Sequence, residues 1–132
     1  MILVDTSVLL DIFTRDPHWF TWSSRALCEW GDREQLAYNV ITLAELGVHA
    51  RSAGELEQRL RKLSRRDFPW AAAWPAARAF AEHLARRKWH ELRTPLPDFF
   101  IGAHALVENL PLLTRDPKRV KVSFPTLRLI SP

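Results

Sequence analysis

Hydrophobic residues along this chain follow two patterns: short unbroken runs, and stripes that recur every three or four positions. Unbroken runs are typical of strands buried on both faces of a parallel sheet, whereas three-to-four spacing is typical of one face of a helix. The runs predict strands at residues 2–4, 35–40, 67–70, 110–114 and 127–130, and the stripes predict helices at 7–13, 17–31, 42–52, 54–66, 75–90 and 98–109. This alternation predicts an α/β fold in which helices cover both faces of a central parallel sheet.

Length and composition fit one folded domain that spans residues 1–132. The chain has 132 residues, of which 47% are hydrophobic, and these values fit a single core rather than a disordered chain. No apolar run approaches the roughly 18 residues of a membrane-spanning helix, and no secretory leader precedes residues 2–4, so we expect a cytoplasmic protein with no membrane partner. The single Cys28 excludes an internal disulfide, and we expect it to be buried as a small hydrophobic residue.

The charge balance favours polyanionic partners. Lysine and arginine total 19 against 15 aspartates and glutamates, and basic clusters occur at 59–66, 85–88 and 115–121. Such clusters are most often solvated helix ends and loops, so they point to phosphate contacts only in combination with a site.

Four acidic residues stand where a site in such a sheet would form. Asp5 and Asp116 follow predicted strands, and Asp98 and Glu45 lie at or near the starts of predicted helices. Because the ligand crevice of an open parallel sheet lies beyond the carboxyl ends of its strands, these four carboxylates could converge there. Asp5 and Asp98 could instead cap helices, and Asp116 could start a turn. Glu45 could close a capping box with Thr42.

A cluster of four carboxylates favours a divalent cation, because like charges a few ångströms apart resist joint ionisation. Mg²⁺ or Mn²⁺ takes oxygen ligands and is typically held by one or two carboxylates together with water and substrate phosphate. Phosphodiester hydrolysis is the reaction that fits such a cation best. The basic clusters would then hold flanking phosphates, and Arg115, beside Asp116, is the candidate for a direct phosphate contact.

The histidines and tryptophans admit other interpretations. Glu45 and His49 have the spacing of a zinc pair on one helix face, but no convincing third ligand accompanies them. His104 follows Asp98 by six residues, about 120° round a helix, and is not expected to join the acids. The tryptophans of the 17–31 stripe either stack on RNA bases or pack in the core or against a partner helix, and their helical spacing favours packing.

Four motifs in one order give the chain a family resemblance. They are "VDTSVLLD" at 4–11, "TLAEL" at 42–46, "PDFFIGAHA" at 97–105 and "LPLLTRDPKRV" at 110–120. The chain resembles PIN-domain ribonucleases over essentially its whole length, and more narrowly the VapC-type toxins of type II toxin–antitoxin pairs. It departs from the family pattern in the bulky pair that follows Asp98 and in a segment between residues 66 and 95 that is rich in tryptophan and alanine.

The resemblance implies a function and a set of site residues. It implies a parallel sheet of about five strands, dependence on Mg²⁺ or Mn²⁺, and endonucleolytic cleavage of an RNA substrate that leaves a 5′-phosphate and a 3′-hydroxyl. It implies a homodimer inhibited by a cognate antitoxin. The residues implied are Asp5, Glu45, Asp98 and Asp116 as the catalytic and metal-binding acids, with Thr6 and Thr114 beside them.

Three other functions stay open on the sequence alone. The first is a PIN-type nuclease that processes RNA rather than controlling growth. The second is a module that binds RNA or a protein on the same fold without cutting, although a binding surface gains nothing from four acids that face a polyanion. The third is a phosphatase or nucleotidase with the same metal chemistry.

Overall fold

A five-stranded parallel sheet forms the centre of the molecule. The structure is a computed structural model that describes residues 1–89, 91 and 96–132. The strands are β1 (Ile2–Val4), β2 (Leu36–Tyr38), β3 (Ser64–Arg65), β4 (Leu112–Leu113) and β5 (Leu129–Ile130). They lie in the order β3-β2-β1-β4-β5, and every neighbouring pair is parallel. The α/β architecture predicted from the sequence is therefore confirmed.

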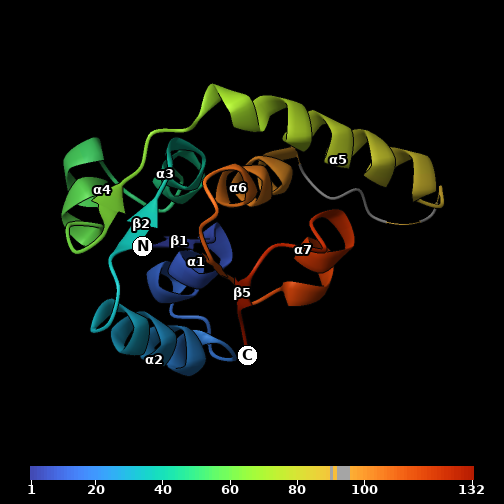
Figure 1. The fold of residues 1–132 in the computed structure, drawn as a ribbon. Helices are drawn as coiled ribbons and strands as arrows, with labels where there is room; N and C mark the ends of the chain where they lie inside the picture. Colours follow the sequence, from blue (N-terminus) through green and yellow to red (C-terminus); the bar gives the residue numbers. More distant parts are fainter. Residues whose placement is uncertain (90, 92–95) are drawn as a thin grey trace.

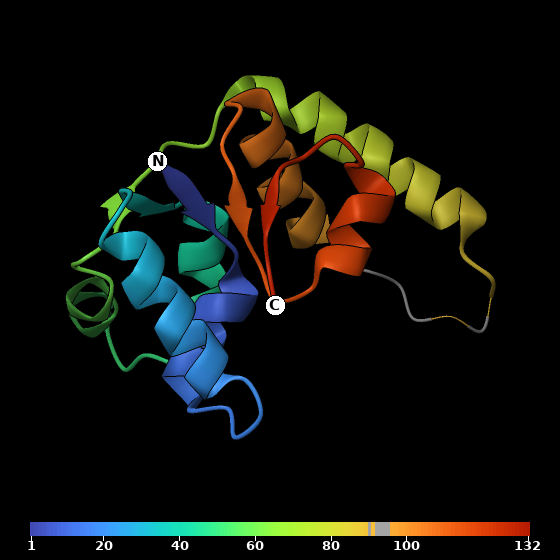
Figure 2. The ribbon, with the colours of Figure 1, turned by 60° about the horizontal axis from the view of Figure 1, so that its bottom comes forward.

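Helices cover the sheet on both faces. Figures 1 and 2 show α1 and α2 on one side of the strands, with α5 and α6 on the other. The helices are α1 (Thr6–Thr14), α2 (Phe20–Gly31), α3 (Val40–Gly47), α4 (Ala53–Arg59), α5 (Ala73–Arg86), α6 (Leu96–Val107) and α7 (Pro117–Ser123), and a short 3₁₀ helix, η1, spans Trp70–Ala72. The helix expected over 75–90 thus ends at Arg86, and residue 90 lies outside the described residues.

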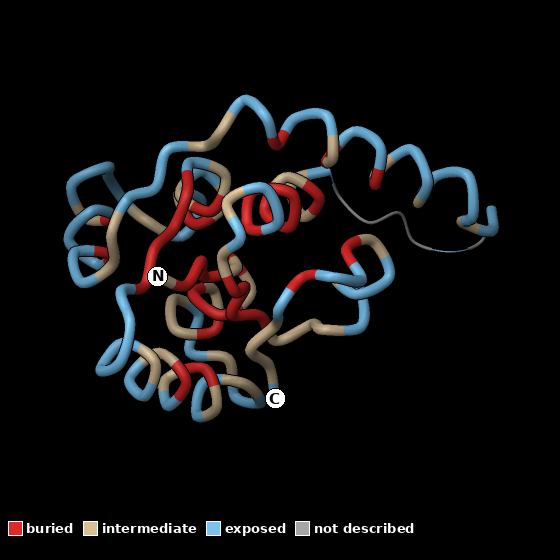
Figure 3. Tube along the Cα trace, in the orientation of Figure 1, coloured by how far each residue is buried: buried red, intermediate tan, exposed pale blue. Residues whose placement is uncertain are grey.

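The strands are short, and their side chains alternate between two hydrophobic cores. Ile2 and Val4 of β1 pack into a core with α1 to α4, whereas Leu3, between them, packs into a second core with α5 and α6. Leu113 and Leu112 of β4 divide in the same way. Successive residues of a strand point to opposite faces of its sheet, so each short run supplies both cores at once. Figure 3 shows these buried strands at the centre.

Two predictions near the β3 edge were wrong. The strand expected at 67–70 is absent: pairing with β2 occurs at Ser64–Arg65, and the chain then enters η1. Pro69 lacks an amide hydrogen and cannot donate to a strand ladder, which disfavours a strand over 67–70. The helix expected over 54–66 is correspondingly shorter and ends at Arg59.

A short helix stands where a turn was expected at 115–121. Asp116 is the N-cap of α7 and accepts a hydrogen bond from the backbone nitrogen of Arg119 at 3.4 Å. Pro117 occupies the first helical position, where a missing amide hydrogen costs nothing. An N-cap aspartate followed by proline is a helix start signal that the sequence contains.

The tryptophan stripe of α2 packs mainly inward. Trp22 and Trp30 are partly buried against the core that α1 and α2 share, so the packing interpretation is confirmed for them. Trp19 meets Trp22 edge to face, with ring centroids 6.2 Å apart. Cys28, expected to be buried, is exposed on the same helix. None of the described helices is long and apolar enough to cross a membrane.

A glycine on α6 allows the end of α7 to approach closely. A Cβ atom added to Gly102 would lie 2.4 Å from Cε2 and 2.6 Å from Cδ2 of Phe124, a residue that is only 5% exposed. Gly102 is one helical turn beyond Asp98, on the same side of α6. The contact between Gly102 and Phe124 therefore sets how near α7 comes to the face of α6 that bears Asp98.

We expect the substitution Gly102→Ala to lower the free energy of unfolding by about 1 to 2 kcal/mol. Overpacking a buried site destabilises the fold by about 1 to 3 kcal/mol, and the better helix propensity of alanine offsets up to about 1 kcal/mol of that loss. Urea unfolding followed by circular dichroism measures the difference. Gly54→Ala in α4 is the matched control, because a Cβ there would meet only Ser52 Oγ at 3.9 Å, and it should be neutral or stabilising. Equal stability of the two variants would contradict this account of the packing.

Candidate functional site

The carboxyl ends of β1 and β4 meet at the point where the strand order reverses. Sequential strands run from β1 outward to β2 and β3 on one side, and β4 and β5 lie on the other. Crevices for ligands form at such a switch point. Asp5 directly follows β1, and Thr114 directly follows β4. Thr114 Oγ1 donates a hydrogen bond to Asp5 Oδ2 at 2.7 Å, so the two strand ends are joined through their side chains.

Asp5 does not act as a helix cap. It occupies the N-cap position of α1, but its side chain accepts no capping hydrogen bond from the helix backbone. Instead, Asp5 Oδ2 accepts hydrogen bonds from the hydroxyls of Thr114 and Ser7, the latter at 2.8 Å. Within the described residues, Asp5 Oδ1 accepts no hydrogen bond, which leaves that oxygen available to a ligand in the pocket that Asp5 lines.

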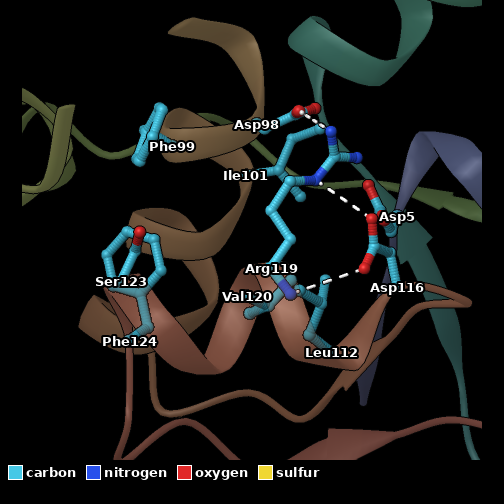
Figure 4. Close-up of a pocket in the computed structure, with 10 residues that line it drawn as sticks. All are labelled: Asp5, Asp98, Phe99, Ile101, Leu112, Asp116, Arg119, Val120, Ser123 and Phe124. Carbon is cyan, nitrogen blue, oxygen red and sulfur yellow. Dashed lines mark hydrogen bonds and ion pairs between the residues drawn. The ribbon is translucent and has the colours of Figure 1, made fainter. Parts of the chain in front are cut away.

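Asp98 and Asp116 complete the rim of the same pocket. Figure 4 shows both side chains turned toward Arg119, with Asp5 beside Asp116. Asp98 lies in the first turn of α6, which begins at Leu96, two residues earlier than predicted. Asp116 caps α7 through Oδ1, rather than starting a turn, and its Oδ2 faces Arg119. Capping and a position in the pocket are compatible for this residue.

Glu45 approaches the acids from α3. Its Oε1 accepts a hydrogen bond from Thr6 Oγ1 at 2.8 Å, which ties α3 to the start of α1. The capping box with Thr42 is wrong, because α3 begins earlier and is capped by Asn39, which accepts hydrogen bonds from the backbone nitrogens of Ile41 and Thr42. Glu45 is therefore free of a capping role and half-buried beside Thr6.

A buried histidine holds the cap of α3. Since Asn39 Oδ1 already accepts from two backbone nitrogens, its amide nitrogen donates to Nδ1 of His104 at 3.0 Å. The ring proton of His104 is then on Nε2, which lies 3.1 Å from Glu108 Oε2. Burial lowers the pKa of His104, in keeping with a neutral ring. As expected, His104 does not line the acid pocket, but it fixes the helix that bears Glu45.

The acids interact electrostatically as one cluster. Burial raises the pKa of Asp98 to about 6, Arg119 opposes that rise, and the charges of Asp5, Glu45 and Asp116 add to it. Burial also raises the pKa of Glu45, against the hydrogen bond from Thr6, and Asp5 contributes to the rise. Asp5, Asp98 and Asp116 line one pocket, and Glu45, which does not line it, is near enough for its charge to act on Asp98.

Arg119 is the residue that sequence reasoning missed. Its Nη1 lies 3.2 Å from Asp98 Oδ2, and its Nε lies 3.2 Å from Asp116 Oδ2. The available signal was the helix start at Asp116 and Pro117, since position i+3 of a helix faces the same side as position i. With 115–121 interpreted as a turn, that relation between Asp116 and Arg119 was not visible.

The predicted phosphate contact, Arg115, points elsewhere. Its Nε lies 3.4 Å from Oδ1 of Asp11, a carboxylate that is only 1% exposed. Its guanidinium also lies over the ring of Trp19, 5.7 Å from the centroid. Ser23 Oγ donates to the other oxygen of Asp11 at 2.7 Å. Arg115 thus joins the start of α7 to α1 and α2, and its contact with a phosphate stays a prediction.

The donor set suits a hard divalent cation with few protein ligands. Within the described residues, no group of three or more His, Cys, Asp or Glu side chains is arranged to hold a metal ion. The pocket nevertheless offers the carboxylates of Asp5, Asp98 and Asp116, and Mg²⁺ commonly binds through one or two carboxylates and keeps several waters. Zinc has no such support here, because His49 lies exposed beyond the end of α3.

Comparison with known proteins gives the family. Residues 2–125 match the model of the PIN domain. One similar solved structure is VapBC2 from Rickettsia felis bound to a promoter DNA fragment, with a TM-score of 0.70, 23% identity, and coverage of 100% of this chain and 99% of that one. Another is a toxin–antitoxin complex from Klebsiella pneumoniae, with a TM-score of 0.65, 25% identity, and coverage of 89% of this chain and 88% of that one. A third is DNA-bound VapBC from Salmonella typhimurium, with a TM-score of 0.65, 23% identity, and coverage of 99% of this chain and 98% of that one. No curated protein matches the sequence. The family match covers nearly the whole chain, so this protein belongs to the PIN domain family.

Proposed function

We propose that this chain is an Mg²⁺- or Mn²⁺-dependent endoribonuclease and the toxin of a type II toxin–antitoxin pair. The observation that supports it most is the pocket that Asp5, Asp98 and Asp116 line together. Burial raises the pKa of Asp98 to about 6, and the charges of Asp5, Glu45 and Asp116 add to the rise. Carboxylates that the fold holds close together repel one another when ionised, and a bound cation removes that repulsion. Membership in the PIN family, which is generally one of nucleases, agrees with this chemistry.

Each acid has a distinct part in the proposed reaction. Asp5 is held in one orientation by the hydroxyls of Thr114 and Ser7, which suits a direct metal ligand. Asp116 lies beside Asp5, and Asp98 lies on the other side of Arg119 in the same pocket. When bound, the cation would lower the pKa of a water and stabilise negative charge on the leaving oxygen. Glu45 does not line the pocket; its Oε1 accepts a hydrogen bond from Thr6, and its raised pKa suits a carboxylate that would accept a proton.

The partners follow from the similar structures and from the charge. Three of those structures are toxin–antitoxin complexes, and we propose a cognate antitoxin for this chain by analogy. The homodimer stays a prediction. A cytoplasmic location would bring the enzyme to its RNA. A nuclease of RNA processing would share every feature of the site, and an expression phenotype separates the two roles.

We expect purified protein to cut total cellular RNA at discrete positions in the presence of Mg²⁺ or Mn²⁺, and chelator to abolish the cuts. Asp5→Asn and Asp98→Asn should each lower the cleavage rate at least about a hundredfold, since even groups that only orient a metal ligand contribute up to that much. Mapping of new 5′ ends measures the cuts and identifies the substrate.

Asp67→Asn is the matched control for this experiment. Asp67 is an exposed acid in the loop after β3, so its replacement makes the same change in charge outside the acid pocket. It should leave the cleavage rate within about twofold of the wild type, as surface substitutions usually do little. RNA cuts that persist in both pocket variants would indicate a contaminating nuclease. Hydrolysis of mononucleotides in place of RNA would favour a phosphatase.

Asp98 should make stability depend on pH in the absence of divalent cations. Its pKa in the folded chain is raised from 3.8 to about 6, so the folded state binds the proton more tightly than the unfolded state does. The stability that the protonated carboxyl supplies is full below pH 4 and is lost as pH rises through 6. Asp98→Asn should therefore raise the free energy of unfolding by about 1 to 3 kcal/mol at pH 7.5 and by little at pH 4. Urea unfolding at both pH values measures this, and a gain of equal size at pH 4 would show that the carboxyl charge is not its cause.

A further inference from the structure

Arg119 lies in the acid pocket between two of its carboxylates. Figure 4 shows its guanidinium between Asp98 on α6 and Asp116 at the start of α7. Two of its nitrogens each lie 3.2 Å from a different carboxylate, so one side chain joins the two helices. The side chain of Arg119 is 43% exposed, and its base is fixed on α7 while its tip can leave toward solvent.

The field of Arg119 reaches the rest of the cluster. It lowers the pKa of Asp98 and that of Glu45, in both cases against the larger effect of burial. Acids that repel one another need a positive charge nearby to remain ionised. Within the described residues, Arg119 is the basic side chain that forms ion pairs in this pocket.

The guanidinium of Arg119 already faces the carboxylate oxygens of Asp98 and Asp116 that a metal ion would need. With Arg119 in place, the cavity measures about 20 Å³. Holding one water takes about 10 to 15 Å³ by the same measure, so the cavity accepts one or two waters. Mg²⁺ dehydrates reluctantly and keeps several waters, and its charge would repel the guanidinium. Occupation by Arg119 and occupation by the hydrated ion are therefore alternatives.

We propose that Arg119 is a built-in counterion that competes with the divalent cation for Asp98 and Asp116 and swings out of the pocket when the cation binds. This rests on the proposed function in that it takes the acid pocket as the metal site. In this proposal Arg119 is a positioning residue. It holds the acids together in the metal-free chain and raises the cation concentration that is needed to fill the metal site.

Direct Mn²⁺ binding to the full chain tests this, with isothermal titration calorimetry as the measurement and no RNA present. Arg119→Gln should bind Mn²⁺ about tenfold more tightly than Lys118→Gln, because two ion pairs no longer have to be broken. Lys118 is the matched control: it is the preceding residue on α7, is exposed, forms no ion pair with the described residues, and its loss changes the net charge equally. Arg119→Lys, which cannot span both carboxylates with a single ammonium, should fall between the wild type and Arg119→Gln.

The other outcomes separate the failure of this inference from the failure of the proposed function. Equal affinity of Arg119→Gln and Lys118→Gln for Mn²⁺ would mean that only net charge matters, and it would overturn the proposal. Weaker binding by Arg119→Gln, with an unchanged melting temperature, would mean that Arg119 assembles the metal site. Absence of Mn²⁺ binding in every variant would overturn both this inference and the metal dependence of the proposed function. Tighter binding by Arg119→Gln without RNA cleavage by any variant would support the counterion and reject the nuclease.

Discussion

The forced proximity of like-charged carboxylates is the constraint on which the site depends. Separate strands and helices must hold Asp5, Asp98 and Asp116 close together although each raises the cost of ionising its neighbours. The frame that withstands this repulsion is the pairing of β1 with β4, in which Leu3 lies beside Leu112 in a fully buried register. A well-packed core resists the displacement that would relieve the repulsion.

Packing contacts far from the chemistry set the positions of the remaining acids. The absence of a side chain at Gly102 lets Phe124 rest on α6, so the end of α7 lies against the helix that bears Asp98. On the other side of the pocket, the hydrogen bond from Asn39 to the buried His104 ties the start of α3 to α6. The acids thus depend on α6 as a common support, because both α3 and α7 are located relative to it.

The sequence predicts this arrangement unevenly, and the reasons are physical. Strand and helix periodicity located the elements, and the position of Asp5 after β1 and of Asp116 after β4 followed from the geometry of parallel sheets. The predicted helix boundaries were wrong where a capping residue sets the start of the helix. Asn39, rather than Thr42, caps α3, and Asp116 with Pro117 begins a helix rather than a turn. The partner of a charged side chain is a tertiary property, so the basic cluster at 115–121 could not show which arginine enters the pocket.

Arg115 and Arg119 lie close to Asp116 in the sequence, yet Arg115 has a structural role and Arg119 lies in the acid pocket. Arg115 precedes α7 and reaches back to Asp11, a buried carboxylate of α1, so its charge is used inside the fold. Arg119 follows one turn later and lies on the pocket side of the helix. An acid pocket that binds a polyanion must first be neutralised, by a guanidinium or by a metal ion. In the proposed exchange a metal ion would replace the guanidinium, so the carboxylates would keep a positive partner while Arg119, whose side chain is 43% exposed, moves toward solvent.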